Sequence, residues 1–190
     1  MDILKTDALA PLLAALNRAE GRVILAIDGG SCSGKSTLAA ALAERYGGEV
    51  FHMDDFYLRP AQRTPERYAE AGGNVDRERF AQEVLEPLRR GERVAYRAFD
   101  CHAMTLRPAV SRGTARVRIV EGSYALHPAL REYYDLTALL RVSKETQRER
   151  VLAREGERAA AFFERWIPME DAYLAATRPE AFADFVIDVP

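Results

Sequence analysis

The sequence predicts an α/β fold built on a mostly parallel sheet, and three observations point to it. Short runs of β-branched and apolar residues alternate with longer segments of helical periodicity, as in parallel sheets with helical crossovers. Residues 23–27 (VILAI) are apolar at every position, which is typical of a strand covered on both faces. A glycine-rich turn follows this strand directly and leads into a helical pattern.

Helices are expected on both sides of this strand in the sequence. Thr6 is a suitable N-cap for a helix that runs to about Ala19. Its apolar positions fall on one helical face: Leu9, Leu12, Leu13 and Leu16. A second helix is expected over residues 36–46, and the Gly47-Gly48 pair is expected to end it.

A second strand and a long excursion follow. Residues 50–53 (VFHM) are expected to form a short strand. Residues 57–75 are polar and rich in proline and glycine, which indicates a loop with one helical turn. Residues 76–90 are amphipathic, and Pro87 is expected to bend or shorten this helix before Gly91 ends it.

The second half of the chain returns to alternating strands and helices. Residues 92–112 are irregular or β. Further strands are expected where β-branched and apolar residues cluster, at 117–120, 136–142 and 185–189. Helical patterns cover about 143–155 and about 159–176. A chain of 190 residues is expected to form one compact domain spanning residues 1–190.

The glycine-rich turn at residues 29–36, GGSCSGKS, fits the phosphate-loop pattern G-x-x-x-x-G-K-[ST]. Glycines permit backbone angles that point successive N–H groups at phosphate oxygens, and the following helix adds its positive dipole end. In this pattern Lys35 reaches the β- and γ-phosphates, and the Ser36 hydroxyl can bind Mg²⁺. The residues expected to contact the nucleotide are Gly29, Gly30, Ser31, Cys32, Ser33, Gly34, Lys35, Ser36 and Thr37.

Acidic residues follow two of the expected strands. Asp54 and Asp55 lie at the carboxyl end of the second strand, where α/β sheets bind ligands. Adjacent side chains in an extended segment point to opposite sides, so we assign Asp54 to the phosphates and Asp55 to loop or solvent. Glu121 ends the strand at 117–120, at the position of a Walker B carboxylate. The alternatives are solvated turn acids for the aspartates and an ion pair with an arginine for Glu121.

Arg150, Arg154 and Arg158 follow a spacing of four residues and share one helical stripe. Like charges at this spacing repel each other unless an anion lies against them. A phosphate could be that anion. Glutamates interleave with the arginines, so a solvated face with ion pairs explains the pattern equally simply: Glu145, Glu149, Glu155 and Glu157.

Three short motifs occur in a fixed order: GGSCSGKS, then MDDFYL at residues 53–58, then VEGSYA at residues 120–125. Together they resemble the uridine kinase and phosphoribulokinase family of P-loop kinases, over about residues 22–189. The resemblance implies a P-loop NTPase fold of three α/β/α layers with a mostly parallel five-stranded sheet. It also implies a substrate-binding excursion at about 56–112, and a lid with C-terminal helices at about 143–176.

The resemblance implies roles for individual residues. Asp54 matches the family's catalytic base and would also lie at the Mg²⁺, and Tyr57 matches a substrate contact. Glu121 matches a carboxylate associated with Mg²⁺. Asp76 matches an aspartate that binds ribose hydroxyls, and His102 a histidine that binds substrate.

The resemblance also places arginines over ATP. Family lids close on the nucleotide with arginines, and Arg148, Arg150 and Arg154 lie in the matching region. One segment departs from the family: residues 74–78 read NVDRE, where the usual pattern is N-F-D-H-P. The resemblance therefore supports a small-molecule kinase more firmly than it supports uridine as the acceptor.

The expected function is transfer of the γ-phosphoryl group of ATP, with Mg²⁺, to a small-molecule hydroxyl, foremost the 5′-hydroxyl of a pyrimidine nucleoside. Alternatives are a kinase for pantothenate, a sugar or nicotinamide riboside. A P-loop switch acting on a protein partner is a different class, as is a nucleotide-binding module without catalysis. The chain lacks N-K-x-D and D-x-x-G switch motifs, and the intact Lys35, Asp54 and Glu121 argue against a non-catalytic module.

Composition limits the partners. The chain has 27 Lys and Arg against 29 Asp and Glu, a formal net charge of −2, which argues against a nucleic-acid partner. Its apolar runs fall short of the roughly 20 residues of a membrane span, and its start lacks the basic residues of a signal peptide. Cys32 and Cys101 are too few for a disulfide scaffold. We expect a cytoplasmic protein; a homo-oligomer and a preference for GTP over ATP stay open.

Replacing Lys35 by alanine should abolish phosphoryl transfer and leave the fold intact, because the loop is a surface turn whose backbone does not need the amine. Steady-state turnover reports the first effect and a thermal melt the second. A wild-type kcat in the variant would remove Lys35 from the mechanism.

Overall fold

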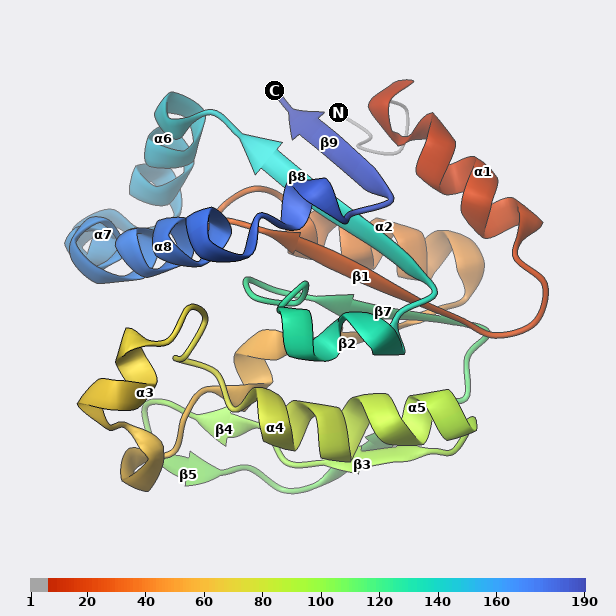
Figure 1. Cartoon of the computed structure of the whole chain (residues 1–190), viewed down its shortest axis with the longest axis horizontal. Helices are drawn as coiled ribbons and strands as arrows, with labels where there is room; N and C mark the ends of the chain where they lie inside the picture. Colours follow the sequence, from red (N-terminus) through yellow and green to blue (C-terminus); the bar gives the residue numbers. More distant parts are fainter. Residues whose placement is uncertain (1–6) are drawn as a thin grey trace.

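The computed structural model describes residues 7–190 (Figure 1). Its centre is a 5-stranded sheet in the order β2-β7-β1-β8-β9, in which every neighbouring pair runs parallel. The strands are β1 (Val23–Gly29), β2 (Glu49–His52), β7 (Val117–Glu121), β8 (Leu136–Val142) and β9 (Phe185–Val189). The predicted α/β fold with a mostly parallel five-stranded sheet is confirmed.

Helices cover both faces of the sheet and so make three layers (Figure 1). One face packs against α1 (Ala10–Arg18) and α2 (Lys35–Tyr46), whose buried leucines meet alternate residues of β1. The opposite face packs against the helical run of residues 77–90 and against α8 (Ile167–Thr177). Because β1 is buried at every position, its apolar run has no solvent-facing side.

The expected excursion is the connection between β2 and β7. Its helical segments are η3 (Met53–Phe56), η4 (Pro60–Gln62), α3 (Pro65–Ala69), α4 (Arg77–Phe80), η5 (Ala81–Leu85) and α5 (Glu86–Arg90). Two short antiparallel sheets pair β3 (Val94–Tyr96) with β6 (Val110–Arg112), and β4 (Phe99–Asp100) with β5 (Thr105–Leu106). The excursion therefore has more regular structure than the single helical turn expected before residue 76.

The remaining helical segments flank the sheet or link its strands. They are η2 (Asp7–Leu9), η6 (Pro128–Tyr133), α6 (Lys144–Glu155), η7 (Gly156–Arg158), α7 (Ala159–Ala161), η8 (Phe162–Trp166) and η9 (Pro179–Ala181). The expected N-cap Thr6 lies outside the described residues. Ser143 caps α6, because its side chain accepts a hydrogen bond from the Thr146 N–H.

Two helical runs contain a π-helical turn close before a proline. Pro87 follows η5, and Pro168 follows η8. A proline ring clashes with the carbonyl four residues earlier and cannot donate a hydrogen bond, so a wider turn gives it room. The helix around Pro87 therefore continues to Arg90 instead of being shortened.

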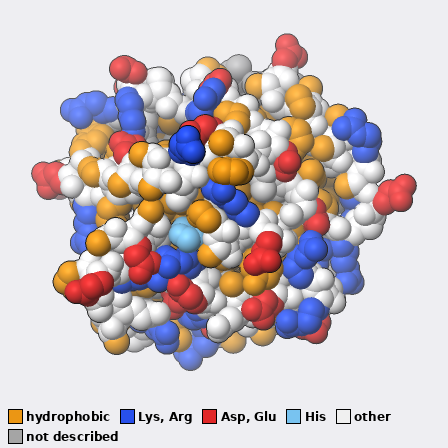
Figure 2. Space-filling model, viewed as in Figure 1, with side chains coloured by type: hydrophobic (Ala, Val, Ile, Leu, Met, Phe, Trp, Pro, Cys, Tyr) orange, Lys and Arg blue, Asp and Glu red, His pale blue; other side chains and the backbone are white. Residues whose placement is uncertain are grey.

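The surface carries charges of both signs. On the face shown in Figure 2, basic and acidic side chains are interspersed. This mixture agrees with the formal net charge of −2 for the whole chain. Among residues 7–190, no helix combines the length and the apolar character needed to cross a membrane.

A buried carboxylate joins three segments at the carboxyl end of β1. Asp28 is 1% exposed. It accepts hydrogen bonds from the N–H groups of Gly29 (2.6 Å), Tyr124 (3.2 Å) and Leu126 (2.8 Å) and from the Tyr173 hydroxyl (2.7 Å). Burial raises the pKa of Asp28, and the hydrogen bonds from Leu126 and Tyr173 oppose that rise. Because the donors belong to the phosphate loop, the loop after β7 and α8, Asp28 fixes these three segments relative to one another.

Asp28→Asn should lower the free energy of unfolding by about 1–3 kcal/mol, because one amide oxygen cannot replace two carboxylate oxygens and a buried N–H loses its acceptor. Tyr173→Phe removes a single donor and should cost about 1 kcal/mol. Urea unfolding of both variants checks the order. An Asn variant as stable as the wild type would mean that the cost of burying the charge outweighs its hydrogen bonds.

Candidate active site

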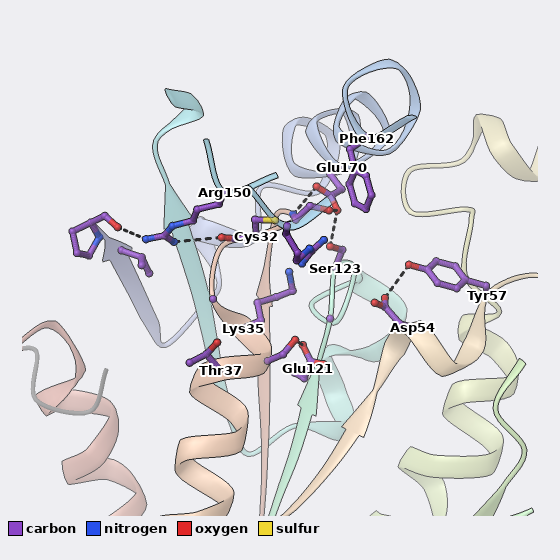
Figure 3. Close-up of a pocket in the computed structure, with 17 residues that line it drawn as sticks. Cys32, Lys35, Thr37, Asp54, Tyr57, Glu121, Ser123, Arg150, Phe162 and Glu170 are labelled. Carbon is purple, nitrogen blue, oxygen red and sulfur yellow. Dashed lines mark hydrogen bonds between the residues drawn. The ribbon is translucent and has the colours of Figure 1, made fainter. Parts of the chain in front are cut away.

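A cavity of about 540 Å³ opens at the carboxyl end of the sheet, where the phosphate loop meets the ends of β2 and β7 (Figure 3). Lys35 lies at its centre in this view, with Asp54 and Tyr57 on one side and Arg150 on the other. The parallel strands explain this meeting, because their carboxyl ends reach the same edge of the sheet. The cavity thus unites the predicted phosphate loop with the predicted carboxylates.

Six residues of the phosphate loop and the start of α2 line the cavity. They are Ser31, Cys32, Gly34, Lys35, Ser36 and Thr37. Gly29, Gly30 and Ser33 are not among them. A side chain at Gly29 would place its Cβ 2.4 Å from the Leu140 carbonyl oxygen, so this position needs glycine for close approach to β8. Gly34 is left-handed, with φ 95°, and immediately precedes α2.

Lys35 is largely buried, and its amine donates a hydrogen bond to the Gly30 carbonyl oxygen at 2.9 Å. The loop backbone therefore does use the amine, contrary to the expectation from the sequence. One such bond is worth about 1 kcal/mol. That is small beside the 5–15 kcal/mol of stability typical of a domain.

Glu121 lies at the end of β7, is 5% exposed, and has two partners. Its Oε1 lies 2.5 Å from His52 Nδ1, and its Oε2 accepts a hydrogen bond from the Ser36 hydroxyl at 3.2 Å. The hydrogen bond to Glu121 raises the pKa of His52. The partners of Glu121 are thus a histidine and the loop serine, and the alternative of an ion pair with an arginine is wrong. Sequence analysis missed this role of His52.

The segment that carries Asp54 and Asp55 is the helical turn η3, so the assumption of an extended segment is wrong. The two side chains nonetheless point apart. Asp54 lines the cavity and accepts a hydrogen bond from the Tyr57 hydroxyl at 3.0 Å, whereas Asp55 accepts one from the Tyr96 hydroxyl at 2.8 Å. The Asp54 side chain is exposed toward the cavity, and the protein atoms around its carboxylate remove part of its hydration. This desolvation raises the pKa of Asp54, against the opposing charge of Lys35.

Two of the three lid arginines reach the cavity. Arg150 and Arg154 line it, and Arg150 Nη1 donates to the Cys32 carbonyl oxygen at 3.3 Å. Arg148 is not among the lining residues; its guanidinium lies 4.8 Å from the centre of the Phe163 ring. Arg150 and Arg154 therefore face the cavity, whereas Arg148 is exposed beside Phe163.

Asp76 and His102 are not among the residues that line the cavity. Asp76 is buried, accepts hydrogen bonds from the Arg79 N–H (3.2 Å) and from Gln62 Nε2 (2.8 Å), and so caps α4. His102 is exposed between β4 and β5, where its N–H donates to Asp100. The Asp76 N–H donates to the Phe56 carbonyl oxygen at 2.7 Å, so Asp76 lies beside the segment that carries Tyr57, and its role toward a substrate stays a prediction, as does that of His102.

Sequence analysis missed six residues that line the cavity, among them Ser123, Phe162 and Glu170. Ser123 had a signal, because it follows Glu121 by two residues at the end of a strand. Phe162 and Glu170 had none, because they are more than 100 residues from the phosphate loop and sit in ordinary helical patterns. Only the packing of the C-terminal helices brings them to the loop.

The oxygen donors of Ser36, Asp54 and Glu121 fit a Mg²⁺ site completed by nucleotide phosphates. Within residues 7–190 there is no cluster of three or more His, Cys, Asp or Glu able to hold a metal ion alone. Mg²⁺ in kinases is typically bound by one or two carboxylates together with substrate phosphates and water. The donor set at the cavity is of that kind.

Solved structures with the same fold cover almost the whole chain. A "possible uridine kinase" from Bacillus stearothermophilus has a TM-score of 0.72 and 23% identity, over 96% of this chain and 98% of its own. A "putative fructose transport system kinase" from Silicibacter sp. TM1040 has a TM-score of 0.69 and 26% identity, over 97% and 100%. YFH7 from Saccharomyces cerevisiae, a "putative P-loop containing kinase with a circular permutation", has a TM-score of 0.62 and 14% identity, over 96% and 97%.

No protein-family profile matches the chain. The structural likeness establishes the fold as that of uridine kinase and phosphoribulokinase-type P-loop kinases. The resemblance stated from the three sequence motifs is confirmed at this level.

Asp54→Asn should lower kcat by roughly 10²–10⁴, the usual effect of losing a positioned general base, and should change the KM for the acceptor less. Asp55→Asn should be far milder, because Asp55 is bonded to Tyr96 and is not among the cavity-lining residues. Steady-state kinetics of both variants on one accepted substrate makes the comparison. A dead Asp55 variant beside an active Asp54 variant would shift the D-x-F-Y motif by one residue and remove the role of Tyr57.

Proposed function

We propose that the protein is an ATP- and Mg²⁺-dependent kinase for a small-molecule hydroxyl, foremost the 5′-hydroxyl of a pyrimidine nucleoside. One observation carries the proposal: the phosphate-loop lysine, the strand-end Glu121 and the separate carboxylate Asp54 line a single cavity. A phosphate loop alone serves many nucleotide-binding proteins. Phosphoryl transfer to a hydroxyl also requires a base for that hydroxyl. Asp54, which follows β2 and faces the loop, is a carboxylate in position to act as that base.

The phosphate side of the cavity would hold ATP. In the proposed complex the Lys35 amine leaves the Gly30 carbonyl and binds the β- and γ-phosphates. Ser36 and Glu121, already bonded to each other, would hold Mg²⁺ together with the phosphates. The metal ion supplies charge neutralisation on the transferring phosphoryl group. His52 keeps Glu121 oriented through its hydrogen bond to Oε1.

The acceptor would bind on the opposite side, beside Asp54. Its carboxylate would orient the acceptor hydroxyl and take its proton as the phosphoryl group transfers. Tyr57 donates a hydrogen bond to Asp54, which holds the carboxylate in place and puts an aromatic ring at the acceptor position. The Tyr57 ring lies 6.4 Å from the Trp166 ring, and Phe162 lines the same cavity. These aromatic faces favour an acceptor with a planar ring, such as a nucleoside base.

The two regions outside the sheet would have separate roles. Residues 56–112 would form the acceptor side, to which they contribute Tyr57. Residues 143–176 would form a lid over the nucleotide, to which they contribute Arg150, Arg154 and Phe162. The positive charge of the two arginines at the cavity supports this assignment, because such groups stabilise the phosphoryl group in transfer. Asp76 and His102 have no support at the cavity as substrate-binding residues.

A sugar is the second candidate acceptor. The similarity to the Silicibacter protein, described as a fructose transport system kinase, favours it. The departure of residues 74–78 from the uridine kinase pattern points the same way. Both acceptors present a hydroxyl to Asp54, so the mechanism proposed above applies to either.

The experiment is ATP turnover with Mg²⁺, first without an acceptor and then with uridine, cytidine, fructose, pantothenate or nicotinamide riboside. We expect a phosphorylated nucleoside by mass spectrometry, and a turnover without acceptor at least about tenfold slower, because the proposed lid would exclude water when it closes over the bound nucleotide. Rapid hydrolysis that no acceptor stimulates would instead favour a P-loop switch. Phosphorylation of fructose alone would move the acceptor to the sugars.

A further inference from the structure

Glu170 contacts the phosphate loop from α8, although almost 140 residues separate the two in sequence. It is 5% exposed. Its Oε2 accepts a hydrogen bond from the Ser31 N–H at 2.8 Å, and its Oε1 accepts one from the Ser31 hydroxyl at 2.7 Å. The Ser123 hydroxyl, from the loop after β7, lies 2.8 Å from the same Oε1. One carboxylate therefore joins α8, the phosphate loop and the loop after β7 (Figure 3).

A second lid helix reaches the same loop residue. Gln147, a buried residue of α6, donates from Nε2 to the Ser31 carbonyl oxygen at 3.0 Å. The N–H, hydroxyl and carbonyl of Ser31 are thus all bonded to side chains from α6 and α8. A side chain at Gly30 would place its Cβ 2.8 Å from Gln147 Nε2 and 3.4 Å from Glu170 Oε2. Glycine at position 30, the second residue of the loop, is therefore needed for these two contacts.

Placing a carboxylate beside a phosphate site is electrostatically unfavourable, because like charges repel in a partly buried cavity. The hydrogen bonds to the Glu170 carboxylate offset this cost when their donors have no other acceptor within reach. The Ser31 N–H is such a group, because a buried N–H without a partner costs about 1–3 kcal/mol. The contact geometry thus indicates that Glu170 acts by accepting hydrogen bonds and not by its charge.

We propose that Glu170 is a positioning residue that holds the first half of the phosphate loop in its nucleotide-binding shape and links that shape to α8. The proposal rests on the nucleotide site proposed above and adds how the C-terminal helices control it. Gln147 supports the same loop residue from α6. The proposed lid and the phosphate loop then move as one unit.

Two variants distinguish the effect of side-chain length at position 170 from the effect of its charge. Glu170→Gln keeps the length and one acceptor oxygen but loses the charge, and its amide can donate to the Ser31 or Ser123 hydroxyl. Glu170→Asp keeps the charge but is one methylene shorter and cannot span to Ser31. The Kd for ATP with Mg²⁺ is measured by titration calorimetry without any acceptor, so that binding is read apart from chemistry.

We expect the Gln variant to bind ATP within about threefold of the wild type, and the Asp variant to bind roughly 10- to 100-fold more weakly, as for the loss of the two hydrogen bonds from Ser31. Glu164→Ala, at an exposed glutamate of the adjoining η8, is the matched control and should leave the Kd unchanged. Thermal melts confirm that each variant is folded at the assay temperature.

The opposite order, with a weak Gln variant and a wild-type-like Asp variant, would overturn the proposal in favour of a charge effect. Wild-type or tighter affinity in both variants, or equal weakening in both, would overturn it as well. These outcomes leave the proposed kinase function standing. A wild-type protein that does not bind ATP would instead overturn that function and this inference together.

Discussion

The site depends on one buried carboxylate. Asp28 lies near the end of β1, where the phosphate loop begins, and its two oxygens accept four hydrogen bonds that tie this point to the loop after β7 and to α8. Tyr124, one of the donors, has a left-handed backbone with φ 76°, a conformation that a non-glycine residue adopts only when its surroundings hold it. Ser123 belongs to this same loop, so its position at the cavity follows from the Asp28 contacts, whereas the pairing of β7 with β1 and β2 places Glu121.

Most of the fold could be predicted from the sequence because it depends on local signals. The apolar run of β1, the Gly47 end of α2 and the Ser143 start of α6 each have a cause within a few residues. The phosphate loop is equally local, because its function lies in consecutive backbone groups. The assignment of Asp54 over Asp55 is supported by the structure, but through a helical turn and not through the extended segment from which it was argued.

The rest of the site depends on contacts between distant segments, which a single sequence does not reveal. His52 pairs with Glu121 because β2 and β7 are neighbours in register, a fact of sheet order. Glu170 and Gln147 meet at Ser31 because α6 and α8 both pack over the loop. The family resemblance predicts that Asp76 and His102 bind substrate. In the structure, Asp76 is buried and caps α4, and His102 is exposed between β4 and β5.

The hydrogen bond from the Lys35 amine to the Gly30 carbonyl has a consequence for ligand selection. The Lys35 amine already has a hydrogen-bond partner, so a ligand oxygen has to replace the Gly30 carbonyl oxygen at Lys35 Nζ. The number of hydrogen bonds is unchanged by that exchange, so only the difference between a neutral carbonyl and an anionic oxygen drives it. A carbonyl oxygen is neutral, whereas a phosphate oxygen carries a negative charge that the Lys35 ammonium attracts more strongly. A neutral molecule of similar shape lacks this attraction, so the Lys35–Gly30 contact would favour an anionic ligand over a neutral one.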